Sequence, residues 1–178
     1  MKTVFRLQRL LLCLLAIAAL NGCSKRPGLQ IGDPMPAVAL TDFHGKTVEL
    51  PCDLKGKVVL VRFWALECDF CSKEILFGLE RLYQKYKDLG FVPVAINESL
   101  ISTSDERLKQ FAQLTYPMLT DDHSLVAKRF GVIGLPTTFI FDEQGILRDK
   151  ITGEATIDDF EKRFTTVLYK GEFYDGTY

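Results

Sequence analysis

Two cysteines separated by two residues, Cys68-Asp69-Phe70-Cys71, constrain this chain more than any other feature of its sequence. They follow a largely apolar run, Val58 to Trp64, which is typical of a strand buried on both faces. The pattern after them predicts an amphipathic helix from about Asp69 to Lys87. A strand would thus deliver two thiols to a helix N-terminus, where backbone N–H groups and the helix dipole favour a thiolate. Cys68 would attack a disulfide, and Cys71, one turn further along, would resolve the mixed disulfide.

Spacing alone leaves other uses of two cysteines open. A zinc site would need a second pair of Cys or His ligands, and the two histidines, His44 and His123, stand near no other candidate ligand. Both histidines are expected to be solvated. A haem attachment site would need a histidine directly after Cys71, where Ser72 stands. A structural disulfide stays open, because chains outside the cytoplasm often carry one.

Several short segments, in a fixed order along the chain, carry a resemblance to a known family. They are Ile31-Gly32-Asp33-Pro34-Met35-Pro36, Leu54-Lys55-Gly56-Lys57, Phe63-Trp64-Ala65, the Cys68/Cys71 pair, Glu74, and Gly134-Leu135-Pro136-Thr137-Thr138-Phe139. The chain resembles the membrane-anchored TlpA/ResA-like branch of the thioredoxin-fold proteins, which includes the reductases of cytochrome c maturation. The resemblance implies an enzyme without a cofactor that reduces disulfides of protein substrates. A membrane thiol reductant upstream would supply its electrons.

The resemblance also implies roles for residues around the cysteine pair. Cys68 and Cys71 would be catalytic, and Pro136 would follow a cis peptide bond and lie against the pair. Such a bond costs only about 0.5–1 kcal/mol before proline. Glu74 matches a position that tunes the cysteines, although an acid in the first helical turn would also serve the helix dipole. Trp64 would pack beside the site or simply in the core.

The sequence departs from the family pattern around the first cysteine. Many relatives have an aromatic residue before this cysteine and proline between the two, whereas this chain has Glu67 before Cys68 and Asp69-Phe70 after it. A carboxylate about 4 Å from the thiolate opposes it by roughly 1 kcal/mol in water. The two acids therefore predict a reducing rather than a strongly oxidising couple. Alternatively, both acids face solvent and shift little.

Arg62 is the second departure. Thioredoxin itself has a buried aspartate at the corresponding strand position, and many relatives of this branch have asparagine. An unpaired guanidinium in the interior would be very costly, so we expect an acidic partner, with Glu67 or Glu74 as candidates, or escape to the surface. Without a buried acid as proton acceptor, Glu74 becomes the favoured one.

The N-terminal residues 1–22 are typical of a signal peptide, with Lys2, Arg6 and Arg9 before an apolar run too short to span a bilayer comfortably. Leu20-Asn21-Gly22-Cys23 resembles a bacterial lipobox, which predicts cleavage before Cys23 and its lipidation. Ordinary cleavage or an uncleaved anchor are the alternatives. Residues 23–30 would form the lipidated N-terminus and linker, and the protein would be a membrane-anchored lipoprotein outside the cytoplasm, on the periplasmic side in a Gram-negative cell.

Residues 31–178 are long enough for a single domain with a full core. Strands joined by helices predict an α/β thioredoxin-like three-layer sandwich with a mixed central sheet, preceded by a β-hairpin over residues 31–50. Pro93 should make the strand Phe91–Asn97 locally irregular. A capping box at 103–106 predicts a helix carrying Leu108, Phe111 and Leu114. The aromatic tail, 172–178, has no predicted role.

The remaining composition excludes some partners and leaves one thiol unassigned. Basic and acidic residues number 22 and 23, so no basic patch for nucleic acid emerges. Cys52 is left outside the pair and is expected to be a half-buried small hydrophobe without redox duty. A monomer is expected.

Three other functions compete with disulfide reduction. A thioredoxin-like copper carrier would use two thiolates plus a remote histidine, but such carriers usually place three residues between their cysteines. A peroxidase of the peroxiredoxin type needs threonine three residues before its cysteine, where this chain has Ala65. A binding module with an inert dithiol is the third alternative, and insulin reduction would distinguish it.

Overall fold

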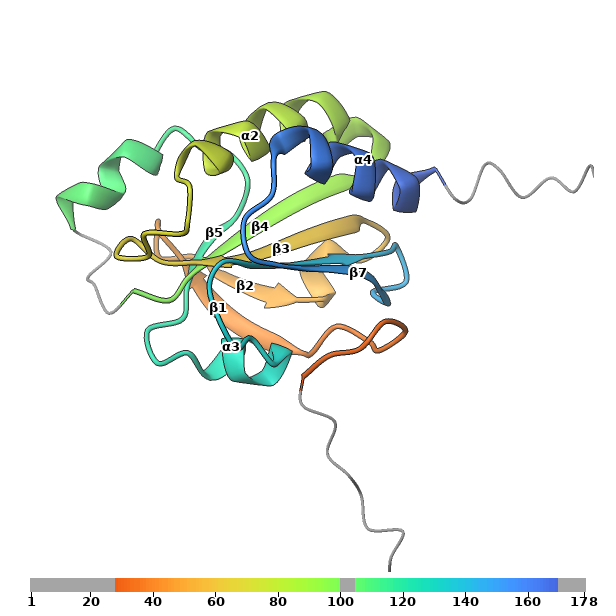
Figure 1. Ribbon diagram of the computed structural model, residues 1–178, viewed down its shortest axis with the longest axis horizontal. Helices are drawn as coiled ribbons and strands as arrows, with labels where there is room; N and C mark the ends of the chain where they lie inside the picture. Colours follow the sequence, from red (N-terminus) through yellow and green to blue (C-terminus); the bar gives the residue numbers. More distant parts are fainter. Residues whose placement is uncertain (1–27, 100–104, 170–178) are drawn as a thin grey trace, which may run out of the picture.

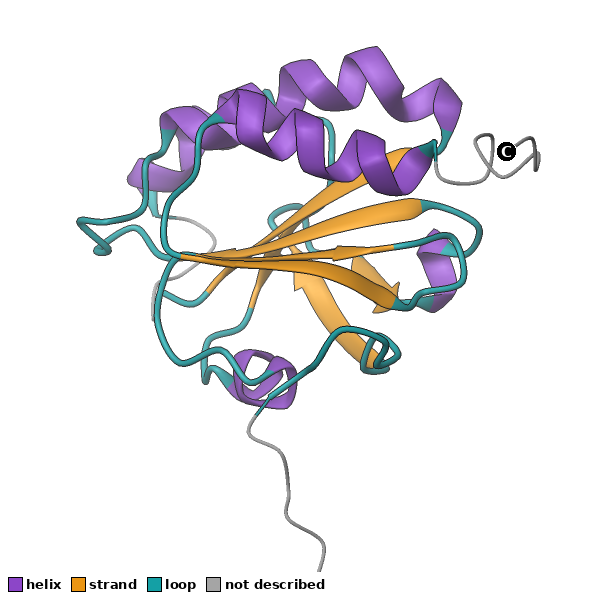
Figure 2. Ribbon diagram, turned by 45° about the vertical axis from the view of Figure 1, so that its right-hand side comes forward, coloured by secondary structure: helices purple, strands orange, loops and turns teal. Residues whose placement is uncertain are grey.

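The structure, a computed structural model, describes residues 28–99 and 105–169. A seven-stranded mixed sheet, in the order β2-β1-β5-β4-β3-β6-β7, lies between helices on its two faces. Helices α2 and α4 cover one face and α3 covers the other (Figures 1 and 2). The strands are β1 Val38–Asp42, β2 Thr47–Leu50, β3 Val58–Trp64, β4 Phe91–Asn97, β5 Met118–Thr120, β6 Thr137–Phe141 and β7 Leu147–Thr152, and the α-helices are α2 Glu74–Tyr86, α3 Leu125–Phe130 and α4 Ile157–Leu168.

The predicted thioredoxin-like architecture is confirmed, including the N-terminal hairpin. β1 and β2 pair antiparallel from Val38↔Leu50 to Thr41↔Thr47, and β1 then joins β5 antiparallel. β6 and β7 form a second antiparallel hairpin at the opposite edge of the sheet. The parallel pairs β3–β4 and β4–β5 lie between them.

The centre of the sheet is the pair β3 and β4, in which every residue is buried. Their parallel register runs without a break from Val58↔Phe91 to Trp64↔Asn97, so the irregularity expected at Pro93 is absent. Backbone N–H groups two residues apart in a strand point to the same side. Ala95 donates its N–H to the carbonyl of Pro117, so the nitrogen of Pro93 also faces the side of β5, but at a level where the pairing of β4 with β5 has not yet started. The N–H that proline lacks would have found no partner there.

Alternation along β3 sends its side chains into two cores. Val59, Val61 and Phe63 pack on the α3 face, whereas Val58, Leu60 and Trp64 pack beneath α2 and α4 with Cys71. By the same alternation Arg62 lies on the α2/α4 face, between Leu60 and Trp64. A fully buried guanidinium therefore stands within an apolar layer.

Helix α2 begins at Glu74 and not at Asp69, so the expectation that it starts at the cysteine pair was wrong. The first helical bond over this segment would join the Ser72 N–H to the carbonyl of Cys68. That carbonyl instead accepts from the Cys71 N–H and from the Lys73 Nζ, while the Ser72 N–H donates to Glu154. A turn therefore replaces the first turn of the expected helix.

The segment after β4 also differs from expectation. A 3₁₀ helix, η3, spans Glu106–Phe111 in place of an α-helix, and Asp105 caps it by accepting from the Arg107 N–H. Leu108 and Phe111 are buried as predicted, whereas Leu114 is buried beyond the end of η3. Within the described residues, short 3₁₀ helices also span Cys52–Leu54 and Lys87–Leu89.

Some expectations lie outside the described residues. These are the signal peptide over 1–22, the lipidation of Cys23, the first two residues of the capping box, Thr103 and Ser104, and the aromatic tail. In the described part of the chain, no helix combines the length and apolar character that crossing a membrane requires.

Candidate active site

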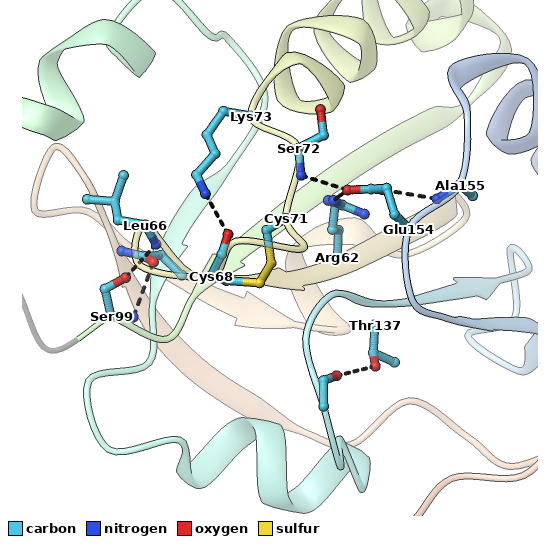
Figure 3. The surroundings of a disulfide bond; sticks show 12 residues. Arg62, Leu66, Cys68, Cys71, Ser72, Lys73, Ser99, Thr137, Glu154 and Ala155 are labelled. Carbon is cyan, nitrogen blue, oxygen red and sulfur yellow. Dashed lines mark hydrogen bonds and ion pairs between the residues drawn. A yellow bond between two sulfur atoms is a disulfide. The ribbon is translucent and has the colours of Figure 1, made fainter.

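Cys68 and Cys71 are joined by a disulfide in the turn between β3 and α2 (Figure 3). Their Cα atoms are 5.3 Å apart. Cys68 is half-buried, whereas Cys71 is 3% exposed and belongs to the core beneath α2. Of the two sulfur atoms, a partner molecule can therefore approach that of Cys68.

Internal hydrogen bonds and one bond to a distant segment hold the turn. The Cys71 N–H donates to the Cys68 carbonyl at 3.1 Å, and Lys73 Nζ donates to the same oxygen at 2.8 Å. On the other side, the Leu66 N–H donates to Ser99 Oγ at 2.7 Å, which ties the turn to the end of β4. The disulfide thus sits in a turn that is closed by its own hydrogen bonds and tied to the segment after β4.

Arg62 has an acidic partner, as expected, but the partner is Glu154 rather than Glu67 or Glu74. Arg62 Nη2 lies 2.7 Å from Glu154 Oε2, and the same oxygen accepts the Ser72 N–H at 2.8 Å (Figure 3). Glu154 follows the last residues of β7, near the start of α4. A carboxylate from the C-terminal part of the fold therefore joins the buried guanidinium to the residue after Cys71.

Several buried polar atoms near this pair have no hydrogen-bond partner within the described chain. They are Nε and Nη1 of Arg62, Nε1 of Trp64 and Oγ1 of Thr138, the residue opposite Arg62 in the β3–β6 register. The Arg62 guanidinium also lies over the Phe160 ring, with Cζ 5.8 Å from the ring centroid. Trp64 is 1% exposed and belongs to the same buried cluster as Cys71, so it lies in the core on the face of the sheet that carries the site.

The Leu135-Pro136 peptide bond is cis, as predicted. The Pro136 carbonyl accepts the N–H of Gly153 at 2.8 Å, and Gly153 precedes Glu154. Thr137 Oγ1 donates to the Gly134 carbonyl at 2.7 Å within the same loop. The end of β7 is thus bonded to the proline loop through Gly153 and to the cysteine turn through Glu154. Leu50-Pro51 is a second cis bond, which sequence reasoning did not anticipate.

Glu74 is exposed at the first position of α2. Its carboxylate accepts a hydrogen bond from Ser72 Oγ at 2.8 Å, which holds the pKa of Glu74 below its ordinary value. An ionised, solvated acid here matches the helix-dipole interpretation. Its tuning of the cysteines stays a prediction.

The two acids that flank Cys68 differ in their surroundings. Glu67 forms an ion pair with Arg107 at 3.2 Å, and a hydrogen bond from Ser99 together with this arginine lowers the pKa of Glu67. Asp69 is exposed. The charge of Glu67 is therefore partly offset by a cation that the motif itself did not reveal.

The remaining candidate residues are exposed. Cys52 is exposed in a 3₁₀ helix, so the expectation of a half-buried residue was wrong. This helix contains no buried residue, because the chain returns to the core only at Val58, where β3 begins. His44 and His123 are exposed, as predicted. Over residues 28–99 and 105–169, no three His, Cys, Asp or Glu side chains gather as a metal site requires.

Comparison with known proteins agrees with this geometry. Residues 31–150 match the AhpC/TSA family. The chain is 34% identical to the thiol-disulfide oxidoreductase ResA of Bacillus cereus over 139 residues, which are 78% of this chain and 79% of that protein. This chain belongs to the AhpC/TSA family. The ResA protein of Geobacillus kaustophilus is 31% identical over 147 residues, 83% of each chain.

Solved structures extend the comparison to the fold. A Chlorobium tepidum protein, named provisionally as the thiol:disulfide interchange protein DsbE, superposes with a TM-score of 0.69 at 29% identity, over 79% of this chain and 99% of that one. The exposed lipoprotein thioredoxin Etrx1 of Streptococcus pneumoniae gives a TM-score of 0.61 at 24% identity, over 73% and 98% of the chains, and so supports the fold alone. The protein is thus a thioredoxin-fold thiol–disulfide oxidoreductase.

Sequence reasoning missed Glu154, Ser99 and Arg107. Arg62 signalled that an acid must be nearby, but nothing in the sequence identified which of 23 acidic residues it was. All three residues reach the site from segments distant in sequence, so no local pattern contained them.

Proposed function

We propose that the protein reduces disulfides of protein substrates outside the cytoplasm, with Cys68 as the attacking thiol and Cys71 as the resolving thiol. The observation that carries this proposal is the contrast between a half-buried Cys68 and a buried Cys71 in one turn. The expected reason for Cys68 to attack was its position at a helix N-terminus. Since α2 begins only at Glu74 and the dipole effect fades within one turn, accessibility is the better support.

The chemistry follows thiol–disulfide exchange. The Cys68 thiolate bonds to one sulfur of the substrate disulfide, and the other substrate sulfur leaves as a thiolate. The Cys71 thiolate then attacks the Cys68 sulfur, which releases the second substrate thiol and forms the Cys68–Cys71 disulfide. Two electrons and two protons pass to the substrate, and an upstream membrane thiol reductant returns them.

The direction of the reaction rests on the acids beside Cys68. A thiolate that is poorly stabilised makes the dithiol a better electron donor, and Asp69 and Glu67 both place negative charge near it. Their combined effect favours reduction of substrates over oxidation. A role in cytochrome c maturation, as in the related branch, would supply such substrates.

Insulin reduction tests the activity and the order of attack. The wild-type protein should accelerate insulin reduction by dithiothreitol, and Cys68→Ser should abolish the acceleration. Cys71→Ser should accumulate a mixed disulfide through Cys68 that survives non-reducing electrophoresis, because no resolving thiol remains. Mixed disulfides that form instead on Cys71 in the Cys68→Ser variant would reverse the assignment, and an inactive wild-type protein would leave only a binding module.

The location rests on the N-terminal sequence. Residues 1–22 would be removed and Cys23 lipidated, so the lipid would anchor the domain in the bilayer. The anchored protein would be a monomer. Mass spectrometry of membrane-extracted protein should find a lipid on Cys23 as the first residue. An intact Met1 or a free Ser24 at the N-terminus would contradict the anchor.

A further inference from the structure

Glu154 is the one charged group of the site that contacts both the buried arginine and the cysteine turn in the described structure. A single oxygen, Oε2, accepts from Arg62 Nη2 at 2.7 Å and from the Ser72 N–H at 2.8 Å. Glu154 Oε2 therefore bridges the Arg62 guanidinium and the backbone amide of Ser72, the residue after Cys71. Figure 3 shows the carboxylate between Ser72 and Arg62, with Cys71 beside them.

Arg62 brings a fixed positive charge behind the redox pair. Its side chain is fully buried, whereas that of Glu154 is 31% exposed. Arginine remains protonated at any pH at which the protein is folded, so its charge must be offset or must favour a nearby anion. Two of its nitrogens, Nε and Nη1, have no acceptor in the described chain, and the π-face of Phe160 compensates only weakly.

We propose that Glu154 is a positioning residue of the redox pair, which fixes the residue after Cys71 and offsets the charge of Arg62, and thereby keeps the protein a reductant. The inference rests on the proposed function in that Cys68 and Cys71 are taken as the working couple. It concerns what sets the potential of that couple, not whether the couple reacts.

The physical argument concerns the two redox states. In the disulfide state the sulfur atoms carry no charge, and Glu154 neutralises Arg62 while holding Ser72. In the dithiol state a thiolate forms, and a guanidinium without its carboxylate would stabilise it. Loss of the Glu154 charge therefore favours the dithiol state and makes the couple more oxidising.

The test measures the equilibrium with glutathione, in which two glutathione thiols reduce the protein disulfide and become one glutathione disulfide. Glu154→Gln keeps the shape of the side chain and an oxygen for the Ser72 N–H, and removes only the charge. We expect the equilibrium constant for reduction of the protein to rise about tenfold, which is about 30 mV for a two-electron couple. Thiolate absorbance should show a cysteine pKa lower than in the wild type.

Two variants separate this effect from a loss of folding. Glu161→Gln is a matched control, because Glu161 also pairs with a cation at 2.7 Å and is 28% exposed, but its partner Lys85 lies outside the redox site. It should leave the glutathione equilibrium within twofold of the wild type. Arg62→Met combined with Glu154→Gln removes both charges, and an apolar replacement of a buried ion pair often folds well. Its equilibrium constant should return toward the wild-type value.

The outcomes distinguish the inference from the proposed function. A Glu154→Gln protein with the wild-type equilibrium constant and thiol pKa would overturn the inference, even if it still reduced insulin. A double variant that kept the whole shift would also overturn it, because the guanidinium would then not be the cause. Failure of the wild-type protein to reduce insulin would instead overturn the proposed function.

Discussion

Arg62 and Glu154, 92 residues apart in sequence, form an ion pair with 2.7 Å between Nη2 and Oε2. The arginine comes from the central strand β3, and the glutamate from the segment between β7 and α4. At this strand position, where thioredoxin itself has a buried aspartate, the protein has a buried cation paired with a carboxylate from another segment. Since Glu154 also accepts from Ser72, the charge balance of the core and the shape of the cysteine turn depend on one carboxylate.

Alkylation of the reduced protein should modify Cys68 before Cys71. Cys68 is half-buried and Cys71 is 3% exposed, so a reagent reaches the first sulfur more easily. Peptide mass spectrometry after brief exposure to iodoacetamide resolves each cysteine, including the exposed Cys52. Earlier labelling of Cys71 than of Cys68 would contradict the assigned roles.

Neutralising the acids beside Cys68 should make the couple more oxidising. Glu67→Gln with Asp69→Asn should lower the Cys68 pKa by about half a unit to one unit, since an exposed charge contributes roughly 1 kcal/mol at 4 Å and one unit is about 1.36 kcal/mol. Asp69→Asn should account for most of this change, because Arg107 already offsets Glu67. Arg107→Gln is the control of opposite sign, because it leaves Glu67 unpaired. Unchanged pKa and potential in the double variant would show that both acids act only as solvated surface charges.

Asp105 should make stability depend on acidity. Hydrogen bonds from the side chain and backbone N–H of Arg107 lower the pKa of Asp105 to about 2. The folded pKa is below the unfolded value of about 3.9, so the stabilisation is complete above about pH 4 and is lost as the pH falls toward 2. Urea unfolding at pH 5 and pH 2.5 should show a smaller difference for Asp105→Asn than for the wild type. Arg107→Gln should also reduce the difference in stability between the two pH values. If both variants keep the wild-type difference, the pair of Asp105 and Arg107 is not its cause.

Gly131→Ala should destabilise the domain. Gly131 ends α3 with a φ of +69°, and a Cβ there would lie 1.9 Å from the Cα of Gly28. We expect a loss of about 1–3 kcal/mol in the free energy of unfolding, measured by urea titration. Gly45→Ala is the matched control, because Gly45 has a φ of +84° but open space around its Cβ. Equal losses in the two variants would mean that the contact with Gly28 contributes nothing.

Much of the fold could be predicted because its signals are local. Phe91–Asn97 was predicted with the bounds that β4 has, and the apolar run to Trp64 identified β3 as the buried central strand. The hairpin before the core was also confirmed. In each case the apolar residues of one segment indicate its burial: a continuous run indicates a strand buried on both faces, and an alternating pattern indicates one buried face. Burial of these residues is the main stabilising term.

The sequence by itself determined the cysteine pair and the need for an acid near Arg62, because each follows from the chemistry of the residues themselves, and the family resemblance of a short motif added the cis proline. Only the tertiary structure decided that the acid is Glu154 and that α2 begins at Glu74. In a helix the Ser72 N–H would donate to the Cys68 carbonyl, four residues earlier. In the structure it donates to the Glu154 carboxylate, 82 residues later. The carboxylate is placed there by the pairing of β7 with β6 and by its attraction to a buried guanidinium. Ion pairs between residues so distant in sequence produce no periodic pattern of apolar and polar residues. Their partners can therefore be identified only in the folded protein.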